Sequence, residues 1–211
     1  MFDLDGTLTR HDTLLPYLSG FLRQHPQRVV RLPQLLPVLA GFAVGRADRG
    51  ALKSAAIRAV LGGRTRAELE AWTGEFVARL IPGGVHRDAL AALEQHCRAG
   101  DHLVLLSASP DLYVPAIGRA LGFAQTVCTG IAWDAERLTG RLTTPNRRGA
   151  EKARCLAALR REHPGLEVVA YGNAASDLDH LALSDHGRLV NGSAVARRAA
   201  AGLNIACVTW H

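Results

Sequence analysis

The spacing of apolar residues changes along this chain of 211 residues, and the change falls near residue 86. Between residues 12 and 86 the apolar positions recur at helical intervals, without the alternation that marks a strand. After residue 86, short apolar runs alternate with helical segments, which is typical of a parallel sheet covered by helices on both faces. The pattern predicts an α/β fold, with a sheet core formed by residues 1–11 and 87–211 and an inserted all-helical cap of residues 12–86.

Polar and glycine-rich positions divide the predicted cap into helices. Asp12 has the residue type of an N-cap, and Thr65 and Glu68 have the spacing of a capping box. Helices are expected over residues 13–23, 29–44 and 48–61, the last ended by Gly62-Gly63, and after Thr65 as far as a break at Pro82-Gly83-Gly84. The helix after Thr65 presents one apolar face, made by Leu69, Trp72, Phe76 and Leu80.

The predicted core alternates helices and strands. In chain order we expect a helix over 86–98 that stops at Gly100, a strand over 102–106, a helix over 110–121, a strand over 126–129, a hairpin over 131–142, a helix over 150–162, a strand over 166–171, a helix over 177–184, and strands over 188–190 and 205–209. Only Met1 and Phe2 precede Asp3, whereas a buried strand has about five residues. We therefore expect a short first strand, as if clipped, at some cost in stability.

The segment 29–44 is the most apolar part of the cap. Arg31 is its only charge, and Pro33 and Pro37 interrupt it. A membrane span needs about 20 apolar residues, so this segment is too short. It can pack inside the cap or lie in a membrane interface, and its thin polar face favours packing inside the cap. Three arginines flank it as possible contacts for an anionic substrate, and the sequence does not choose among them: Arg46, Arg49 and Arg58.

Composition narrows the class of protein. The net charge of +6 favours anionic partners, but the basic residues are scattered arginines without interleaved aromatics, so nucleic-acid binding is not expected. Four widely spaced cysteines form no Cys-x-x-Cys pair, and the histidines show no metal-ligand spacing. With no signal peptide in the sequence, this cysteine usage predicts a protein of the reducing cytoplasm.

The chain opens with two carboxylates at a predicted strand end. Asp3 and Asp5 lie two residues apart and therefore point to the same side of an extended chain. Gly6 permits a turn over a ligand, and Thr7 follows it. One carboxylate can attack while the other moves the proton, which is what phosphoryl transfer through a covalent aspartyl-phosphate requires. Asp-Gly is also ordinary turn chemistry, so this motif needs support from elsewhere.

Three later segments supply that support. Ser107 and Ala108 follow an apolar strand and can offer a hydroxyl and an amide to a phosphate near a helix start. Lys152 is in the first turn of a helix, where the dipole disfavours a cation, as expected of a lysine that points at an anion. Oxygens of residues 171–177 can face Asp3 and close a site for a hard cation. Each segment alone is weak evidence, because a serine after a strand is more often a helix cap and a lone lysine is more often part of a solvated surface.

The four segments, in this order, resemble the signature motifs of the haloacid-dehalogenase superfamily, the first of which reads Asp-x-Asp-Gly-Thr. The helical insertion after the first motif resembles the subgroup with a small helical cap, which includes phosphoserine phosphatases. Residues 21–44 and 105–111 further resemble a bacterial branch called phosphatidylglycerophosphatase-like. The resemblance implies a Rossmann-like parallel sheet and a Mg²⁺-dependent phosphomonoester phosphatase, acting on a small phosphorylated substrate such as an amino-acid or lipid phosphate.

The resemblance also implies a role for each motif residue. Asp3 would be the nucleophile and Asp5 the general acid and base, and the acid at position 5 argues against carbon–halogen chemistry. Ser107 and Lys152 would hold the phosphoryl oxygens. The remaining implied roles are substrate binding by Gly6, Thr7, Ala108 and Asp12, and Mg²⁺ binding by Asp3, Asp5, Asn173 and Asp177. Asp12 is also suited to cap a helix, and that role is favoured.

The fourth motif departs from the family pattern. Asn173 stands where the family has an aspartate, while Asp177 is retained. An amide oxygen still ligates Mg²⁺ but brings no charge, so metal affinity should fall unless Asp179 compensates. An enzyme with a high Mg²⁺ requirement, a slow enzyme and a phosphate-binding protein all stay open, and so does a phosphotransferase on the same scaffold. The other motif residues favour the first.

Overall fold

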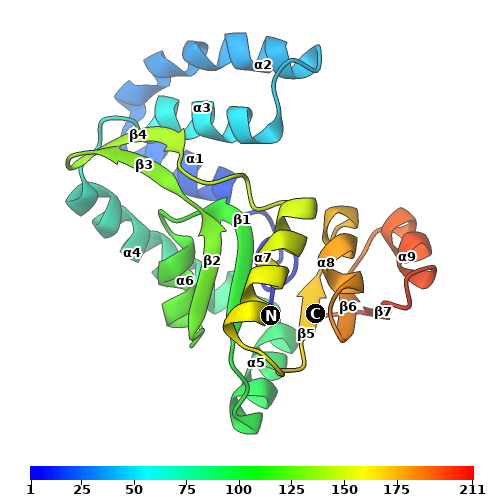
Figure 1. Ribbon diagram of the computed structural model, residues 1–211. Coiled ribbons are helices and arrows are strands. Elements are labelled where there is room, and N and C mark those ends of the chain that lie inside the picture. Colours follow the sequence, from blue (N-terminus) through cyan, green and yellow to red (C-terminus); the bar gives the residue numbers. More distant parts are fainter.

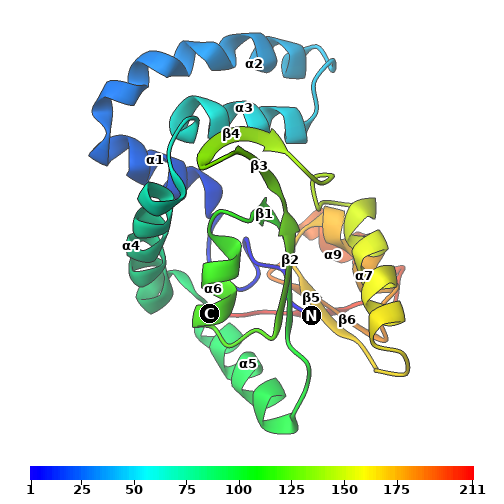
Figure 2. The ribbon, with the colours of Figure 1, turned by 60° about the vertical axis from the view of Figure 1, so that its left-hand side comes forward.

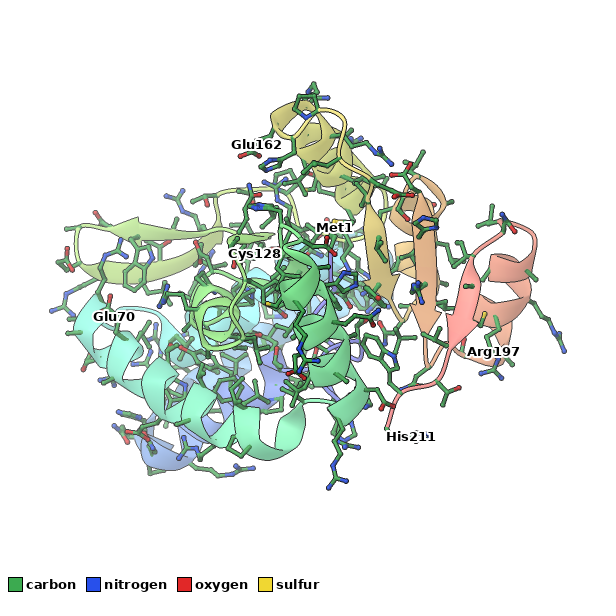
Figure 3. All side chains as sticks on the ribbon, turned by 90° about the horizontal axis from the view of Figure 1, so that it is seen from below. Met1, Glu70, Cys128, Glu162, Arg197 and His211 are labelled. Atoms are coloured by element: carbon green, nitrogen blue, oxygen red, sulfur yellow. The ribbon has the colours of Figure 1, made fainter.

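The core is a parallel sheet assembled around the first three residues of the chain. In this computed structural model, which describes residues 1–211, β1 (Val104–Pro110) pairs with β2 (Gln125–Thr129), and β5 (Val169–Gly172) with β6 (His186–Val190) and β7 (Ala206–Val208). Phe2 lies between the two groups and forms parallel bridges to Leu105 and Tyr171. The first strand is thus short and central, as predicted, and Figure 3 shows Met1 near the middle of the molecule.

Helices cover both faces of this sheet, as the α/β pattern predicted. The core helices are α5 (Arg87–Ala99), α6 (Val114–Ala120), α7 (Ala150–Glu162), α8 (Leu178–Ala182), preceded by the 3-10 turn η2 (Ala175–Asp177), and α9 (Ala194–Ala201). Figure 2 shows α5 and α6 on one face and α7 on the other. The predicted hairpin is confirmed as antiparallel β3 (Ile131–Asp134) and β4 (Arg137–Leu142).

The helical cap stands over the carboxyl ends of the strands (Figure 1). Its elements are α1 (Leu14–Gln24), the 3-10 helix η1 (Pro26–Leu35), α2 (Leu36–Ala43), α3 (Arg49–Leu61) and α4 (Arg66–Gly84). The β3–β4 hairpin reaches up to α3, where the Ser54 hydroxyl donates a 2.8 Å hydrogen bond to the Gly140 carbonyl. The cap boundaries at residues 12 and 86 stay a prediction, with these helices inside them.

Local signals placed several helix ends correctly. Thr65 and Glu68 form the predicted capping box, and Gly62 and Gly100 end α3 and α5. Gly100 has φ +76°, a left-handed conformation that glycine adopts without strain. The predicted break at Pro82-Gly83-Gly84 is confirmed at its last residue, because α4 passes through Pro82 and ends at Gly84. Proline removes a single intrahelical hydrogen bond, and so close to the helix end that loss is tolerated.

One continuous hydrophobic cluster joins cap and core. The aromatic rings of Tyr17 and Phe76 in the cap pack on Tyr113 of the core, with ring centroids of Tyr17 and Tyr113 4.6 Å apart, and Trp72 packs on Tyr17. The predicted apolar face of α4 is confirmed, since Leu69, Trp72 and Phe76 are buried and Leu80 packs against them. The cap is therefore held against the core by the side that contains α1 and α4.

The opposite side of the cap contradicts one expectation. Residues 29–44 do not pack inside the cap: α2 has no buried residue, and Val30 is 80% exposed. The prolines divide the segment into two short helices that lie outside α3, so the other side of each helix has no neighbour (Figure 1). No helix in the structure combines the length and the apolarity that a membrane crossing would require.

Candidate active site

A cavity of about 350 Å³ lies between the cap and the carboxyl ends of the strands. Seven of the predicted site residues line it, namely Asp3, Asp5, Asp12, Ala108, Lys152, Asn173 and Asp177. The cap contributes part of the wall through α1 and α3, including Arg49 and Lys53. The four sequence motifs therefore converge on one place. Gly6, Thr7 and Ser107 lie behind this wall rather than on it.

Lys152 joins two of the converging motifs. Its ammonium group donates to Asp3 Oδ1 at 2.6 Å and to Asp177 Oδ1 at 2.7 Å, and its side chain is almost completely buried. Burial raises the pKa of Asp3 to about 7, even though Lys152 opposes the shift. Burial works against the charged form of Lys152 as well, but the two carboxylates together raise the pKa of its amine. One cation is thus shared by two buried acids.

Lys152 alone does not neutralise the three motif acids. Asp3, Asp5 and Asp177, when ionised, outnumber Lys152 by two charges, and the other cations that line the cavity are Arg49, Lys53 and Arg148. The available donors are two carboxylates, the Asn173 amide and the Asp5 backbone carbonyl, all hard oxygens of the kind Mg²⁺ prefers. With Asn173 in place of an acid, no group of three or more His, Cys, Asp or Glu side chains forms a metal-type cluster. These oxygen donors fit Mg²⁺, but together they carry one negative charge fewer than they would with an aspartate at position 173.

The first and fourth motifs touch at Gly6. This residue has φ +77°, and a Cβ placed on it would lie 2.2 Å from Asn173 Nδ2. Only glycine therefore permits both the turn and the close approach of Asn173. Thr7 donates to Asp3 Oδ2 at 3.0 Å, so it orients the carboxylate of Asp3 from behind.

Asp177 fixes the loop of the fourth motif. Its Oδ2 accepts hydrogen bonds from the backbone amides of Asn173 and Ala174, at 3.1 and 2.9 Å. Burial would raise the pKa of Asp177, but Lys152 and these amides hold it below its ordinary value. Asp179 is exposed and does not line the cavity, so the expectation that it compensates for Asn173 was wrong.

Asp5 is held by hydroxyl groups from both sides of the cavity. Its Oδ1 accepts from the backbone amide and the hydroxyl of Thr13, at 2.7 and 2.6 Å, and its Oδ2 accepts from the Ser109 hydroxyl at 2.6 Å. Burial raises the pKa of Asp5, although these hydrogen bonds oppose the shift. A carboxyl group with a raised pKa and a fixed orientation is suited to donate a proton and take it back.

The second motif is placed differently from the prediction. Strand β1 continues to Pro110 and helix α6 begins only at Val114, so Ala108 is not near a helix start. Ser107 is completely buried, and its Oγ accepts the Ser109 amide at 3.0 Å. Ala108 and Ser109 form the wall of the cavity here. Ser109 was missed by sequence reasoning, although it follows Ser107 at strand spacing and so lies on the same side of the chain.

Lys53 was missed as well. It reaches from α3 of the cap to the core, where its ammonium group donates to the Ala108 carbonyl and, at 2.6 Å, to Asn146 Oδ1. Burial lowers the pKa of Lys53 to about 8. A sequence signal did exist: the chain has two lysines among its 25 basic side chains, and they are Lys53 and Lys152. Both point into this cavity.

Asp12 has the structural role that the sequence favoured. Its Oδ1 accepts the Leu15 amide at 3.1 Å in the first turn of α1. The same side chain also lines the cavity, together with Arg49 and Arg148. Arg46 and Arg58, the other arginines that flank the apolar segment, do not line it.

Comparisons with known proteins agree with this architecture. Residues 1–182 match the haloacid dehalogenase-like hydrolase family. Protein CicA of Caulobacter vibrioides is 34% identical over 188 residues, covering 87% of this chain and 82% of CicA. A protein of unknown function from Bordetella pertussis Tohama I superposes with a TM-score of 0.81 at 22% identity, covering 98% of this chain and 96% of that one. A phosphoserine phosphatase in its phospho-aspartyl intermediate analogue form gives 0.66 at 14%, covering 98% and 90%. The two solved structures show a shared fold.

Proposed function

Because the chain belongs to the haloacid dehalogenase-like hydrolase family, we propose that it is a Mg²⁺-dependent phosphomonoester phosphatase working through an aspartyl-phosphate on Asp3. One observation carries the proposal: Asp3 and Asp177 share the buried Lys152, and Asp5 lies beside them in the same cavity. The phospho-aspartyl form of the structurally similar phosphoserine phosphatase supports it by analogy.

The proposal gives a task to each side chain. Asp3 attacks phosphorus, a P–O bond to its carboxylate forms, and the bond to the leaving oxygen breaks as Asp5 gives that oxygen a proton. Water then attacks the aspartyl-phosphate and loses a proton to Asp5, which frees phosphate and restores Asp3. Lys152 neutralises the phosphoryl oxygens, while Thr13 and Ser109 keep Asp5 in position.

Mg²⁺ would be held by the Asp3 carboxylate, the Asp5 carbonyl, Asn173 and Asp177. When bound, it supplies positive charge that favours ionised Asp3 and balances the phosphoryl oxygens. Because Asn173 contributes no charge, we expect half-maximal activity at a higher Mg²⁺ concentration than an aspartate at this position would give. Asn173→Asp should therefore lower the Mg²⁺ requirement.

The cap side of the cavity indicates the leaving group. Five apolar residues of α1 and α3 line it, namely Leu14, Leu15, Leu18, Leu52 and Ala56. Leu15, Leu18 and Ala56 also line an apolar groove of about 470 Å³ that continues to Leu32 and Leu35 of η1. Such a path accommodates a hydrocarbon portion better than a charged amino acid, so we favour a lipid phosphate over an amino-acid phosphate.

The test is hydrolysis of a panel of phosphate esters with Mg²⁺ titrated. The panel contains a soluble aryl phosphate, phosphoserine, sugar phosphates and short-chain lipid phosphates of increasing chain length. We expect chelation and Asp3→Asn to abolish turnover, and catalytic efficiency to rise with chain length. Turnover retained by Asp3→Asn would overturn the mechanism, and preference for phosphoserine would overturn the substrate class alone.

Asn173 also favours a second candidate, a phosphate-binding protein with little catalysis. It predicts phosphate binding with negligible turnover at saturating Mg²⁺, and activity gained by Asn173→Asp. The product of the reaction distinguishes a phosphotransferase from these two candidates. Release of free phosphate without an added acceptor would exclude a phosphotransferase.

A further inference from the structure

The outermost part of the cap exposes an unusual concentration of large apolar side chains. We call residues 26–46, which comprise η1, α2 and the turn after them, the cap tip. Of the twelve exposed large apolar residues in the chain, six lie here, namely Val29, Val30, Leu36, Leu39, Phe42 and Val44. The other six are spread over three other helices and three loops or turns, so the tip is a patch rather than ordinary scatter.

The charges around the patch have one sign. Residues 25–47 contain no Asp or Glu. Arg28 and Arg31 are held at the base of the tip, where both donate to the Gly62 carbonyl, at 2.6 and 2.9 Å. Arg23, just before the tip, and Arg46, its last residue, are exposed. An apolar surface whose own charges are all positive, with Asp48 as the next acid along the chain, complements a surface that is apolar inside and negatively charged outside.

We propose that the cap tip docks on the surface of an anionic phospholipid bilayer. Its apolar side chains would enter the boundary between headgroups and acyl chains, and the exposed Arg23 and Arg46 would contact the phosphates. Neither η1 nor α2 is long enough to cross the bilayer, so the tip would lie in the interface. A second copy of the chain is a poorer occupant, because two tips would bring arginines together and the tip itself contains no acid to pair with them.

The fold gives the docked state a geometric consequence. The tip is the layer of the molecule farthest from the sheet (Figure 1), so the rest of the protein would stand clear of the bilayer. Leu32 and Leu35 of η1 line the apolar groove, which shares Leu15, Leu18 and Ala56 with the catalytic cavity. Docking would place the end of that groove at the membrane. The docking itself does not depend on the proposed phosphatase activity.

The test is flotation of the intact protein with phospholipid vesicles. Vesicles of phosphatidylcholine mixed with phosphatidylglycerol are compared with vesicles of phosphatidylcholine alone, each at low and high salt. We expect binding to the anionic vesicles that weakens with salt, because screening reduces the arginine contribution. Absence of binding to anionic vesicles at low salt would overturn the proposal.

A matched pair of double variants locates the contact. Val30→Asp with Leu36→Asp changes the tip, and Val195→Asp with Leu183→Asp changes residues of similar exposure on the core, which are 73% and 58% exposed against 80% and 64%. We expect the tip variant to bind about a hundredfold more weakly, since each apolar side chain kept out of the bilayer costs about tenfold. The core variant should bind like the original protein. Equal losses in both variants would contradict docking through the tip.

Two further measurements keep the outcomes separate. Turnover of a soluble aryl phosphate and the unfolding midpoint should be unchanged in the tip variant, which shows that its fold is intact. Light scattering reports self-association. If the protein dimerises through the tip and does not bind vesicles, the patch is an interface between copies and the proposal is wrong. If vesicle binding holds while no phosphate ester is hydrolysed, the proposed function fails and the docking stands.

Discussion

The catalytic cavity and the cap tip reverse the usual distribution of side chains in opposite ways. In the cavity, Lys152 is 2% exposed and Asp3 is 6% exposed, although charged side chains are usually exposed to solvent. At the tip, Val30 is 80% exposed, although it is apolar. The cavity supplies its own partners, since each buried charge meets an opposite charge or hydrogen-bond donors. The exposed apolar side chains of the tip have no corresponding partners within the chain. Changes in the cavity should therefore destabilise the fold, and changes at the tip should not.

The largest effect is expected from Lys152→Ala. The change leaves Asp3 and Asp177 buried without their shared cation, which costs about 3–5 kcal/mol of unfolding free energy. Because protonated carboxyls need no counter-charge, the loss should be greatest at neutral and alkaline pH and should shrink as pH falls. Denaturant unfolding over a pH range measures it. Arg154→Ala, an exposed cation on the same helix, is the control, and similar stability of the two variants would contradict the argument.

A smaller effect is expected from Ser109→Ala, which acts through Asp5. The Ser109 hydroxyl stabilises the ionised carboxylate and so lowers the pKa of Asp5, and its removal should raise that pKa further. The limb of the pH–rate profile that belongs to Asp5 should move to higher pH, with turnover lowered about tenfold at neutral pH. Ser109→Thr keeps the hydroxyl and should restore the profile. A uniform loss of rate without a pH shift would indicate a structural role only.

Lys53 should show a pH dependence of its own. Burial lowers its pKa to about 8 from an ordinary 10.5, so above pH 8 the folded protein loses a cation that faces the substrate. Catalytic efficiency toward an anionic substrate should then fall as pH rises through 8, and Lys53→Arg should abolish the fall. Stability should move the other way. Between pH 8 and 10.5 the unfolded chain holds a proton that the folded chain has released, so the unfolding free energy rises with pH.

Sequence reasoning succeeded where the determinants are local. The capping box at Thr65 and the left-handed Gly100 need only neighbouring residues, and both are present. It failed for α9, which it left out, because the Ala- and Arg-rich segment from Ala194 to Ala201 has little apolar face to reveal it. It failed again for residues 29–44, whose burial depends on what lies beside them. No property of the segment itself indicates that no other element covers this side of the cap.

The same distinction applies to the candidate site. The carboxylates of Asp3 and Asp5 could be found because their order and spacing lie in one stretch of chain. Lys53 could not, because it reaches Ala108 across the boundary of cap and core. What the sequence did contain was the scarcity of lysine among many arginines, and both lysines point into the cavity. A search for motifs by residue spacing does not take into account how rare a residue type is in the chain.

The smallest effect is expected at the tip, where Leu39→Asp tests the other half of the comparison. Leu39 is 44% exposed and α2 has no buried residue, so the folded state gains little from its side chain. The unfolding free energy should change by less than about 0.5 kcal/mol, as for ordinary surface substitutions. Trp72→Ala, on the buried side of the same cap, should cost about 3–5 kcal/mol and is the contrast. A Leu39→Asp variant destabilised to a similar extent would show that the tip packs against the protein in solution. The apolar surface would then already be covered, and nothing would be left for a membrane to contact.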